Sequence, residues 1–200
     1  MSLIRSSVAA AACALLGLVA VCSVSAQTKR GTGTTAVKPS GAKAAPSVGP
    51  KITVLDLEGF KKLLKPASSK PLMINFWATW CDPCVAEFPD LVKIDQLYKG
   101  KIDFVTVSLD DLADIETEVP KFLTKMKAGM PAYLLHADND AAIAAVSADW
   151  AGNLPLTIIY KPSGELVYMR KGAIHIDDVT LELDKLVRTQ NKAAAPASQQ

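Results

Sequence analysis

Two cysteines stand three positions apart, Cys81 and Cys84, separated by Asp82 and Pro83. They directly follow the apolar run at residues 72–77 and open a segment whose apolar residues recur at helical spacing. A cysteine at a helix N-terminus is held as a thiolate by unpaired N–H groups and by the helix dipole. Such a thiolate attacks disulfides, and a thiol one turn further on releases the product. The pair predicts thiol-disulfide exchange, with Cys81 as nucleophile and Cys84 as resolving thiol.

A static disulfide and half of a zinc site are two other uses of such a pair. A disulfide that closes so short a loop removes little chain entropy. A zinc site needs more ligands, and the chain offers only His136 and His175, both far along the sequence. We therefore expect no metal at the pair and no cofactor. A redox-inert copper carrier stays open as an alternative because His175 is able to approach the pair in space, although CxxxC spacing is more typical of such carriers.

The N-terminal segment has the pattern of a secretory signal peptide. Arg5 precedes an apolar stretch at residues 8–21, and small residues before Ala26 suit a signal peptidase. We predict cleavage after Ala26, which removes the two remaining cysteines, Cys13 and Cys22. The product is an exported, periplasmic protein. An uncleaved membrane anchor and a lipoprotein acylated at Cys22 are the alternatives.

The rest of the chain divides by composition. Residues 27–50 are rich in Gly, Thr, Lys, Ala, Ser and Pro and predict a flexible linker, and residues 191–200 predict a disordered tail. Between them, residues 51–190 form the predicted folded domain, with 16 basic and 20 acidic side chains, a balance of −4. This charge gives no basic face, so we expect no nucleic-acid partner.

Strand and helix patterns alternate along the domain. Strands are expected at residues 52–55, 72–77, 102–109, 132–135, 156–160 and 165–170, and helices at 57–64, from 84 to a stop at Gly100, and at 114–126, 141–146 and 177–187. Residues 161–164 predict a hairpin turn, in which Gly164 supplies the left-handed position. The order predicts an α/β fold with a central mixed β-sheet flanked by helices. A CxxC at its first central strand-to-helix junction indicates a thioredoxin-like fold.

Residues 75–89 read NFWATWCDPCVAEFP. This segment resembles the N-F-W-A-T-W-C-x-P-C-x-x-E-x-P signature of exported thioredoxin-like proteins of the TlpA/ResA type, and the resemblance extends over about residues 52–187. Asn75 stands where thioredoxin carries a buried Asp, so that proton-transfer role cannot be assigned here. Glu87 matches the active-site Glu of the TlpA/ResA branch, which implies proton handling around the buried thiol. The alternative is a solvated helix residue.

A second match is the loop NLPLT at residues 153–157. It resembles the loop whose proline is cis in this fold and packs against the Cys pair. The resemblance therefore implies a cis Pro155 and a Leu154 that presents its backbone to the substrate chain like an added strand. A trans proline that begins a strand is the alternative. Trp80 is implied to shield the Cys pair, and Trp77 is expected in the core.

The resemblance implies an extracytoplasmic thiol-disulfide oxidoreductase that acts on protein thiols and disulfides. It favours reduction, as in cytochrome c maturation or reduction of a copper-site chaperone, with electrons from a membrane thiol reductase. We expect a monomer. The direction of electron flow depends on the reduction potential of the Cys pair, which the spacing of the two cysteines does not fix.

Overall fold

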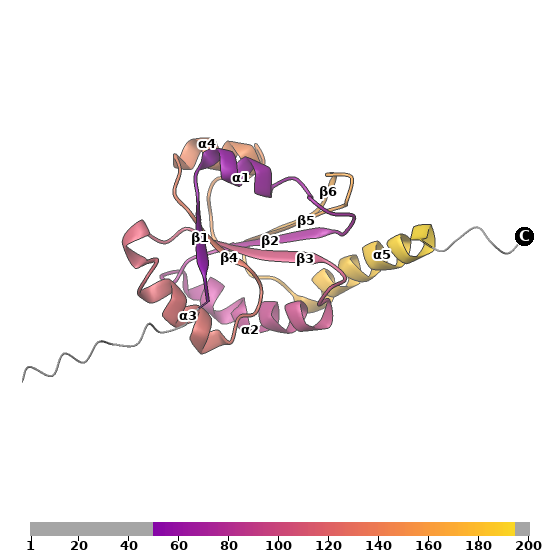
Figure 1. Ribbon diagram of the computed structural model, residues 1–200, viewed down its shortest axis with the longest axis horizontal. Helices are drawn as coiled ribbons and strands as arrows, with labels where there is room; N and C mark the ends of the chain where they lie inside the picture. Colours follow the sequence, from indigo (N-terminus) through magenta and orange to yellow (C-terminus); the bar gives the residue numbers. More distant parts are fainter. Residues whose placement is uncertain (1–49, 195–200) are drawn as a thin grey trace, which may run out of the picture. The chain divides into compact units, whose positions relative to one another are not determined.

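The computed structural model describes residues 50–194, so the predicted signal peptide, nearly all of the predicted linker and the end of the predicted tail lie outside the described residues. Six strands form one sheet in the order β1-β4-β3-β2-β5-β6 (Figure 1). The strands are β1 (Ile52–Leu55), β2 (Leu72–Trp77), β3 (Asp103–Ser108), β4 (Ala132–Leu135), β5 (Leu156–Tyr160) and β6 (Leu166–Lys171).

The sheet is mixed, as the sequence predicts. Strands β1, β4, β3 and β2 are parallel, whereas β5 pairs antiparallel with β2, and β6 pairs antiparallel with β5. The carboxyl ends of β1 to β4 and of β6 therefore lie at the same edge as the amino end of β5. In the turn between β5 and β6, Gly164 has a φ of 86° and donates its N–H to Lys161.

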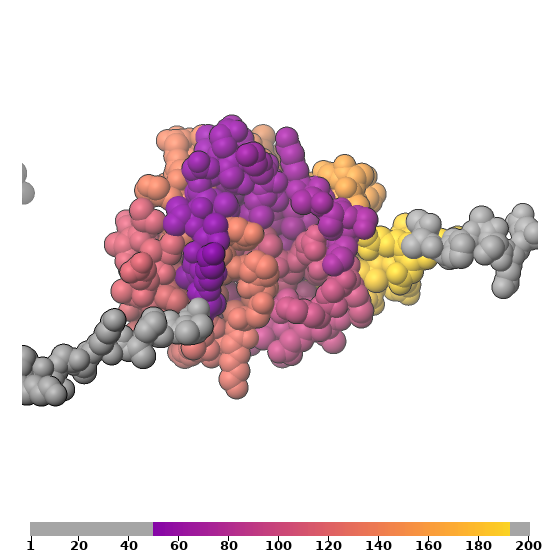
Figure 2. Space-filling model, viewed as in Figure 1, coloured from indigo at the N-terminus to yellow at the C-terminus, as the bar shows by residue number. Residues whose placement is uncertain are grey.

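Helices cover both faces of the sheet (Figure 1). Helices α1 (Leu57–Leu63) and α4 (Asn139–Val146) lie on one face, and α2 (Asp82–Leu97), α3 (Glu118–Met126) and α5 (Ile176–Ala194) lie on the other. A short 3₁₀ helix, η1 (Leu112–Asp114), precedes α3. Strand β1 forms one border of the sheet and reaches the surface (Figure 2), where Val54 is exposed.

Strand β2 is buried on both faces, which explains its nearly continuous apolar sequence, with Asn75 as its one polar residue. On the α2 side, Trp77 and Phe88 pack edge to face with ring centroids 4.9 Å apart, and Phe122 completes the cluster at 4.8 Å from Trp77. On the α1 side, Phe76 packs between Phe60 and Trp150. The expectation that Trp77 belongs to the core is confirmed.

Three helices differ from the sequence-based prediction. The helix expected at 114–126 is split into η1 and α3, because Pro120 has no N–H and its ring clashes with the preceding turn, so a helix must begin close before it. Helix α4 begins at Asn139, since Asp138 caps it by accepting a hydrogen bond from Ala141 N–H at 2.9 Å. Helix α5 continues to Ala194, into the residues predicted as a tail. Within residues 50–194, no helix is long and apolar enough to span a membrane.

The aromatic cluster under α2 predicts a large loss of stability for Phe88→Ala. Phe88 has no exposed surface and contacts both Trp77 and Phe122, so truncation leaves a cavity. We expect the free energy of unfolding to fall by about 3–5 kcal/mol in denaturant titrations of the oxidised protein. Leu97→Ala is the control in the same helix, because this side chain is 58% exposed, and it should change stability by less than about 0.5 kcal/mol. Equal losses in both variants would contradict the packing described here.

Candidate active site

The Cys pair lies at the start of α2, where the sequence places it. Cys81 is the N-cap residue, and its Sγ accepts a hydrogen bond from Cys84 N–H at 3.3 Å. Asp82 and Pro83 form the first helical positions, where a proline removes no helical hydrogen bond. The two cysteines are joined by a disulfide with their Cα atoms 5.3 Å apart. Cys81 is 6% exposed and Cys84 has no exposed surface, so Cys81 is the less buried of the two.

Glu87, one helical turn beyond Cys84, is buried with 4% of its surface exposed. Its Oε1 accepts a hydrogen bond from Asn75 Nδ2 at 2.9 Å, and its Oε2 accepts one from Ile174 N–H at 2.7 Å. Burial raises the pKa of Glu87 above its usual value, and the two hydrogen bonds oppose this rise only in part. The alternative of a solvated helix residue is therefore wrong.

Asn75 connects Glu87 to the sheet. Its Nδ2 also donates to Thr157 Oγ1 at 3.0 Å, which links β2 to β5. Its Oδ1 is buried and has no hydrogen-bond partner within the part of the chain that the structure describes. Rotation of the amide would turn this acceptor toward a protonated Glu87, while an unrotated amide donates to the carboxylate. The site thus holds a partner for either protonation state of Glu87.

A second polar network holds the other flank of the Cys pair. The buried carboxylate of Asp110, two residues after β3, accepts hydrogen bonds from Thr79 N–H at 3.0 Å and Thr79 Oγ1 at 2.5 Å. Ser108 Oγ donates to the same carboxylate at 2.5 Å. These bonds fix the chain two residues before Cys81. The sequence analysis missed Asp110, although a carboxylate directly after a strand that ends beside the CxxC was a signal for it.

The loop before β5 lies at the same edge of the sheet. The peptide bond between Leu154 and Pro155 is cis, as the sequence predicts. Pro155 is buried, and its carbonyl accepts a hydrogen bond from Gly172 N–H at 2.9 Å. Leu156, the next residue, pairs with Phe76 at the end of β2, so the loop lies close to the chain that leads to Cys81. The substrate-binding roles of Leu154 and Pro155 stay predictions.

Trp80 is the residue before Cys81, and 66% of its surface is exposed. It lines a hollow of about 270 Å³ together with Leu109, Leu135, Trp150 and Gly152. These residues come from the ends of β3 and β4 and from the loop before β5. The predicted shielding of the Cys pair by Trp80 is a property that the structure leaves untested.

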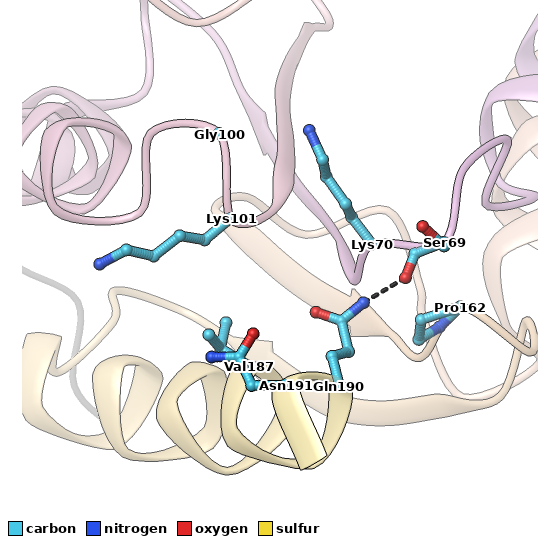
Figure 3. Close-up of a pocket in the computed structure, with 8 residues that line it drawn as sticks. All are labelled: Ser69, Lys70, Gly100, Lys101, Pro162, Val187, Gln190 and Asn191. Carbon is cyan, nitrogen blue, oxygen red and sulfur yellow. Dashed lines mark hydrogen bonds between the residues drawn. The ribbon is translucent and has the colours of Figure 1, made fainter. Parts of the chain in front are cut away.

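A broader hollow of about 780 Å³ lies at the opposite edge of the sheet (Figure 3). Lys70 precedes β2 and Lys101 precedes β3, and Gln190 of α5 donates a hydrogen bond to the Ser69 carbonyl across the hollow. Because Cys81 lies beyond the other end of β2, this hollow is not part of the redox site. Among residues 50–194, no three His, Cys, Asp or Glu side chains are grouped so as to hold a metal ion.

Comparison with known proteins finds thiol-disulfide oxidoreductases among the sequence relatives. Thiol-disulfide oxidoreductase ResA of Oceanobacillus iheyensis is 33% identical over 129 residues, which cover 64% of this chain and 63% of that protein. Thiol-disulfide oxidoreductase ResA of Geobacillus kaustophilus is 26% identical over 146 residues, which cover 72% of this chain and 79% of that protein. The chain thus spans less than two thirds of the length of the first relative and more than two thirds of the length of the second. The predicted enzyme class is the one for which both are named.

The fold has similar solved structures as well. A DsbF homologue from Corynebacterium diphtheriae superposes with a TM-score of 0.52 at 19% identity, over 60% of this chain and 73% of that one. A likeness at this identity supports the thioredoxin-like fold alone. The Redoxin family matches residues 40–169, a range that holds the Cys pair, Glu87 and Pro155. The resemblance to ResA-type thioredoxin-like proteins is thereby confirmed, and the chain belongs to the Redoxin family.

Proposed function

We propose that this chain is an exported thiol-disulfide oxidoreductase that reduces disulfides in other proteins. The observation that carries the proposal is the Cys81–Cys84 disulfide at the N-terminus of α2, with Cys81 the less buried of the two. Helix N–H groups stabilise an anion at this position, and burial of Cys84 protects the second thiol until a mixed disulfide has formed.

The reaction consists of two exchanges. The Cys81 thiolate attacks one sulfur of the partner's disulfide, forms a mixed disulfide, and expels the other sulfur as a thiolate that takes up a proton. The Cys84 thiol then loses its proton, attacks Cys81 Sγ and releases the second partner thiol. Two electrons and two protons pass to the partner, and the chain ends with the Cys81–Cys84 disulfide.

Glu87 is proposed to handle the proton of Cys84 in the second step. It lies one helical turn from Cys84, it is buried, and its raised pKa brings the carboxyl closer to the range in which a group both accepts and releases a proton. Asn75 provides a donor and an acceptor beside it. The cis Pro155 and Leu154 are proposed to bind the substrate backbone.

The direction of transfer and the location are further parts of the proposal. The leader pattern at residues 1–26 supports export to the periplasm, where a membrane thiol reductase would reduce the Cys pair again. The substrates would then be proteins such as an apocytochrome c or a copper-site chaperone. A redox-inert metal carrier is the rival function, and no group of ligands in the described residues favours it.

Exchange of single cysteines tests the order of attack. With Cys84→Ser, Cys81 should still attack but the mixed disulfide should persist, so that partner adducts appear on non-reducing gels and disappear on reduction. With Cys81→Ser, no adducts should form, because Cys84 is fully buried. Adducts in the Cys81 variant alone would reverse the assigned roles, and their absence from both variants would argue against exchange with proteins.

The pH dependence of stability tests the buried Glu87. Because its pKa is raised in the folded protein, the folded state binds the proton more tightly than the unfolded state. This contribution to stability is complete below the unfolded pKa, near 4.5, and is lost as the pH rises through the folded pKa. The free energy of unfolding should therefore fall over that window by up to about 1.4 kcal/mol per pH unit relative to Glu87→Gln. Glu58→Gln, at an exposed side chain, should leave the dependence unchanged.

The reduction potential of the Cys pair tests the direction. A reductant should have a value near that of thioredoxin, about −270 mV, and an oxidant one near that of DsbA, about −120 mV. We expect the lower value, measured by equilibration of the oxidised and reduced protein with dithiothreitol. A value near the upper one would make the chain an oxidant of protein thiols and overturn the proposed direction.

A further inference from the structure

Four chain segments meet beside the nucleophile. Because β2, β3 and β4 are parallel and β5 is antiparallel to β2, the segments after the first three strands and before the fourth lie at one edge. They enclose the 270 Å³ hollow, whose walls include Trp80, Leu109, Leu135, Ile143 and Trp150. The hollow therefore lies on the β3–β4 side of Cys81.

Most of the surface of Trp80, 66%, is exposed in the described part of the chain. Indole rings are costly to leave in water and rank among the side chains that contribute most to binding. Trp80 is the most exposed of the large apolar side chains in the core domain, and it is adjacent in sequence to the residue that must bond to the partner's sulfur. An apolar side chain near the partner's cysteine would fill the hollow beside it.

The charge on this side of Cys81 is of one sign. Residues 71–92, 102–120 and 128–160 contain no Lys or Arg. Exposed carboxylates in the segments that meet at this edge include those of Asp82, Asp111, Asp138, Asp140 and Asp149. None of them is in an ion pair in the described part of the chain, whereas carboxylates elsewhere pair with lysines, as Glu165 does with Lys161 at 3.0 Å.

Helix capping explains part of this pattern. Asp111 and Asp138 are N-cap residues that accept hydrogen bonds from Ala113 N–H and Ala141 N–H, and acidic residues are stabilising in the first turn of a helix. Capping does not explain Asp149, nor the lack of any cation in these segments. On the other side of the site, Arg170 and Lys171 end β6, and at the opposite edge Lys70 and Lys101 line the hollow of Figure 3.

We propose that the β3–β4 side of this edge is a docking face for a disulfide-bearing polypeptide. The face consists of the hollow beside Trp80 and the carboxylates of Asp138, Asp140 and Asp149. The partner carries an apolar side chain next to its cysteine, which enters the hollow beside Trp80, and Lys or Arg residues on one flank, which lie over Asp138, Asp140 and Asp149. Arg170 and Lys171 repel that basic flank from the other side, so the charge also sets the direction in which the segment crosses Cys81. This inference rests on the proposed function, in which the docked disulfide accepts two electrons and two protons from the Cys81–Cys84 dithiol.

The test uses the reduced protein and disulfide-linked peptide homodimers of one length. One peptide has Leu beside Cys and three flanking Lys, the second replaces Lys by Glu, and the third replaces Leu by Ala. The second-order rate constant is measured by thiol alkylation. We expect the Lys peptide to react at least about tenfold faster than the Glu peptide at low ionic strength, with the ratio shrinking in about 0.5 M salt. The Ala peptide should be several-fold slower than its Leu counterpart at either salt concentration.

Protein variants separate docking from the intrinsic reactivity of the peptides. The triple variant Asp138→Asn, Asp140→Asn, Asp149→Asn keeps a good N-cap residue and should lose most of the preference for Lys. The control Asp103→Asn, Glu165→Gln, Glu182→Gln changes the net charge equally at ion-paired carboxylates away from this edge and should retain it. Equal preferences in the two variants would overturn the docking face.

A small neutral disulfide, 2-hydroxyethyl disulfide, distinguishes this failure from failure of the proposed function. The peptide rates of each protein are divided by its rate with this small disulfide, which corrects for any change in the reactivity of Cys81 itself because the small disulfide makes no use of the docking face. If it oxidises the Cys pair but the preference for the Lys peptide does not depend on the three aspartates, the docking-face proposal is wrong and the proposed oxidoreductase function is retained. If neither it nor any peptide oxidises the Cys pair, the proposed function itself is wrong.

Discussion

The buried carboxyl of Glu87 is the constraint on which the arrangement of the site depends. A carboxyl group taken out of water must be hydrogen-bonded, and Glu87 finds its partners in Asn75 of β2 and in the backbone of Ile174 before α5. Asn75 extends the network to Thr157 of β5. Glu87 of α2 is thus linked directly to β2, through Asn75 to β5, and directly to the loop between β6 and α5. Because the bonds form only in this register, the network fixes how α2, with Cys81 at its start, lies on the sheet.

A second constraint acts from the other side of the Cys pair. Asp110 is bound by Ser108 and by both the backbone and the hydroxyl of Thr79, so the turn into α2 is held from β3 as firmly as the helix is held from β2. The two networks leave Cys81 between fixed ends. This explains how Cys81, at a loop-to-helix junction, keeps its N-cap geometry without being buried as deeply as Cys84.

Much of this fold follows from local sequence. The buried run at β2, the helical spacing after Cys84 and the Pro-Ser-Gly turn each have one physical interpretation, and the structure agrees with them. The sequence-based prediction is wrong where a single residue decides where a helix begins. Pro120 splits the helix expected at 114–126, and Asp138 caps α4 so that it begins earlier than expected. Burial of Glu87 and the bonds of Asp110 depend on residues 87 and 31 positions away, a separation that periodicity does not reveal. The motif resemblance marked Glu87, whereas Asp110 lay outside the motif and had no such marker.

The charge around Cys81 sets a compromise between reactivity and selectivity. The N-terminus of α2 favours the thiolate, whereas the carboxylates on the β3–β4 side oppose any further negative charge at the same place. A site built for nonselective attack would gain from cations there, and residues 71–92, 102–120 and 128–160 contain no Lys or Arg. The carboxylates therefore destabilise the Cys81 thiolate in the free protein. A basic partner removes this effect, because the cations of the partner offset the carboxylates as its sulfur approaches Cys81. The thiolate is then stabilised most when a positively charged partner approaches. A basic partner is therefore favoured in the attack by Cys81 as well as in binding.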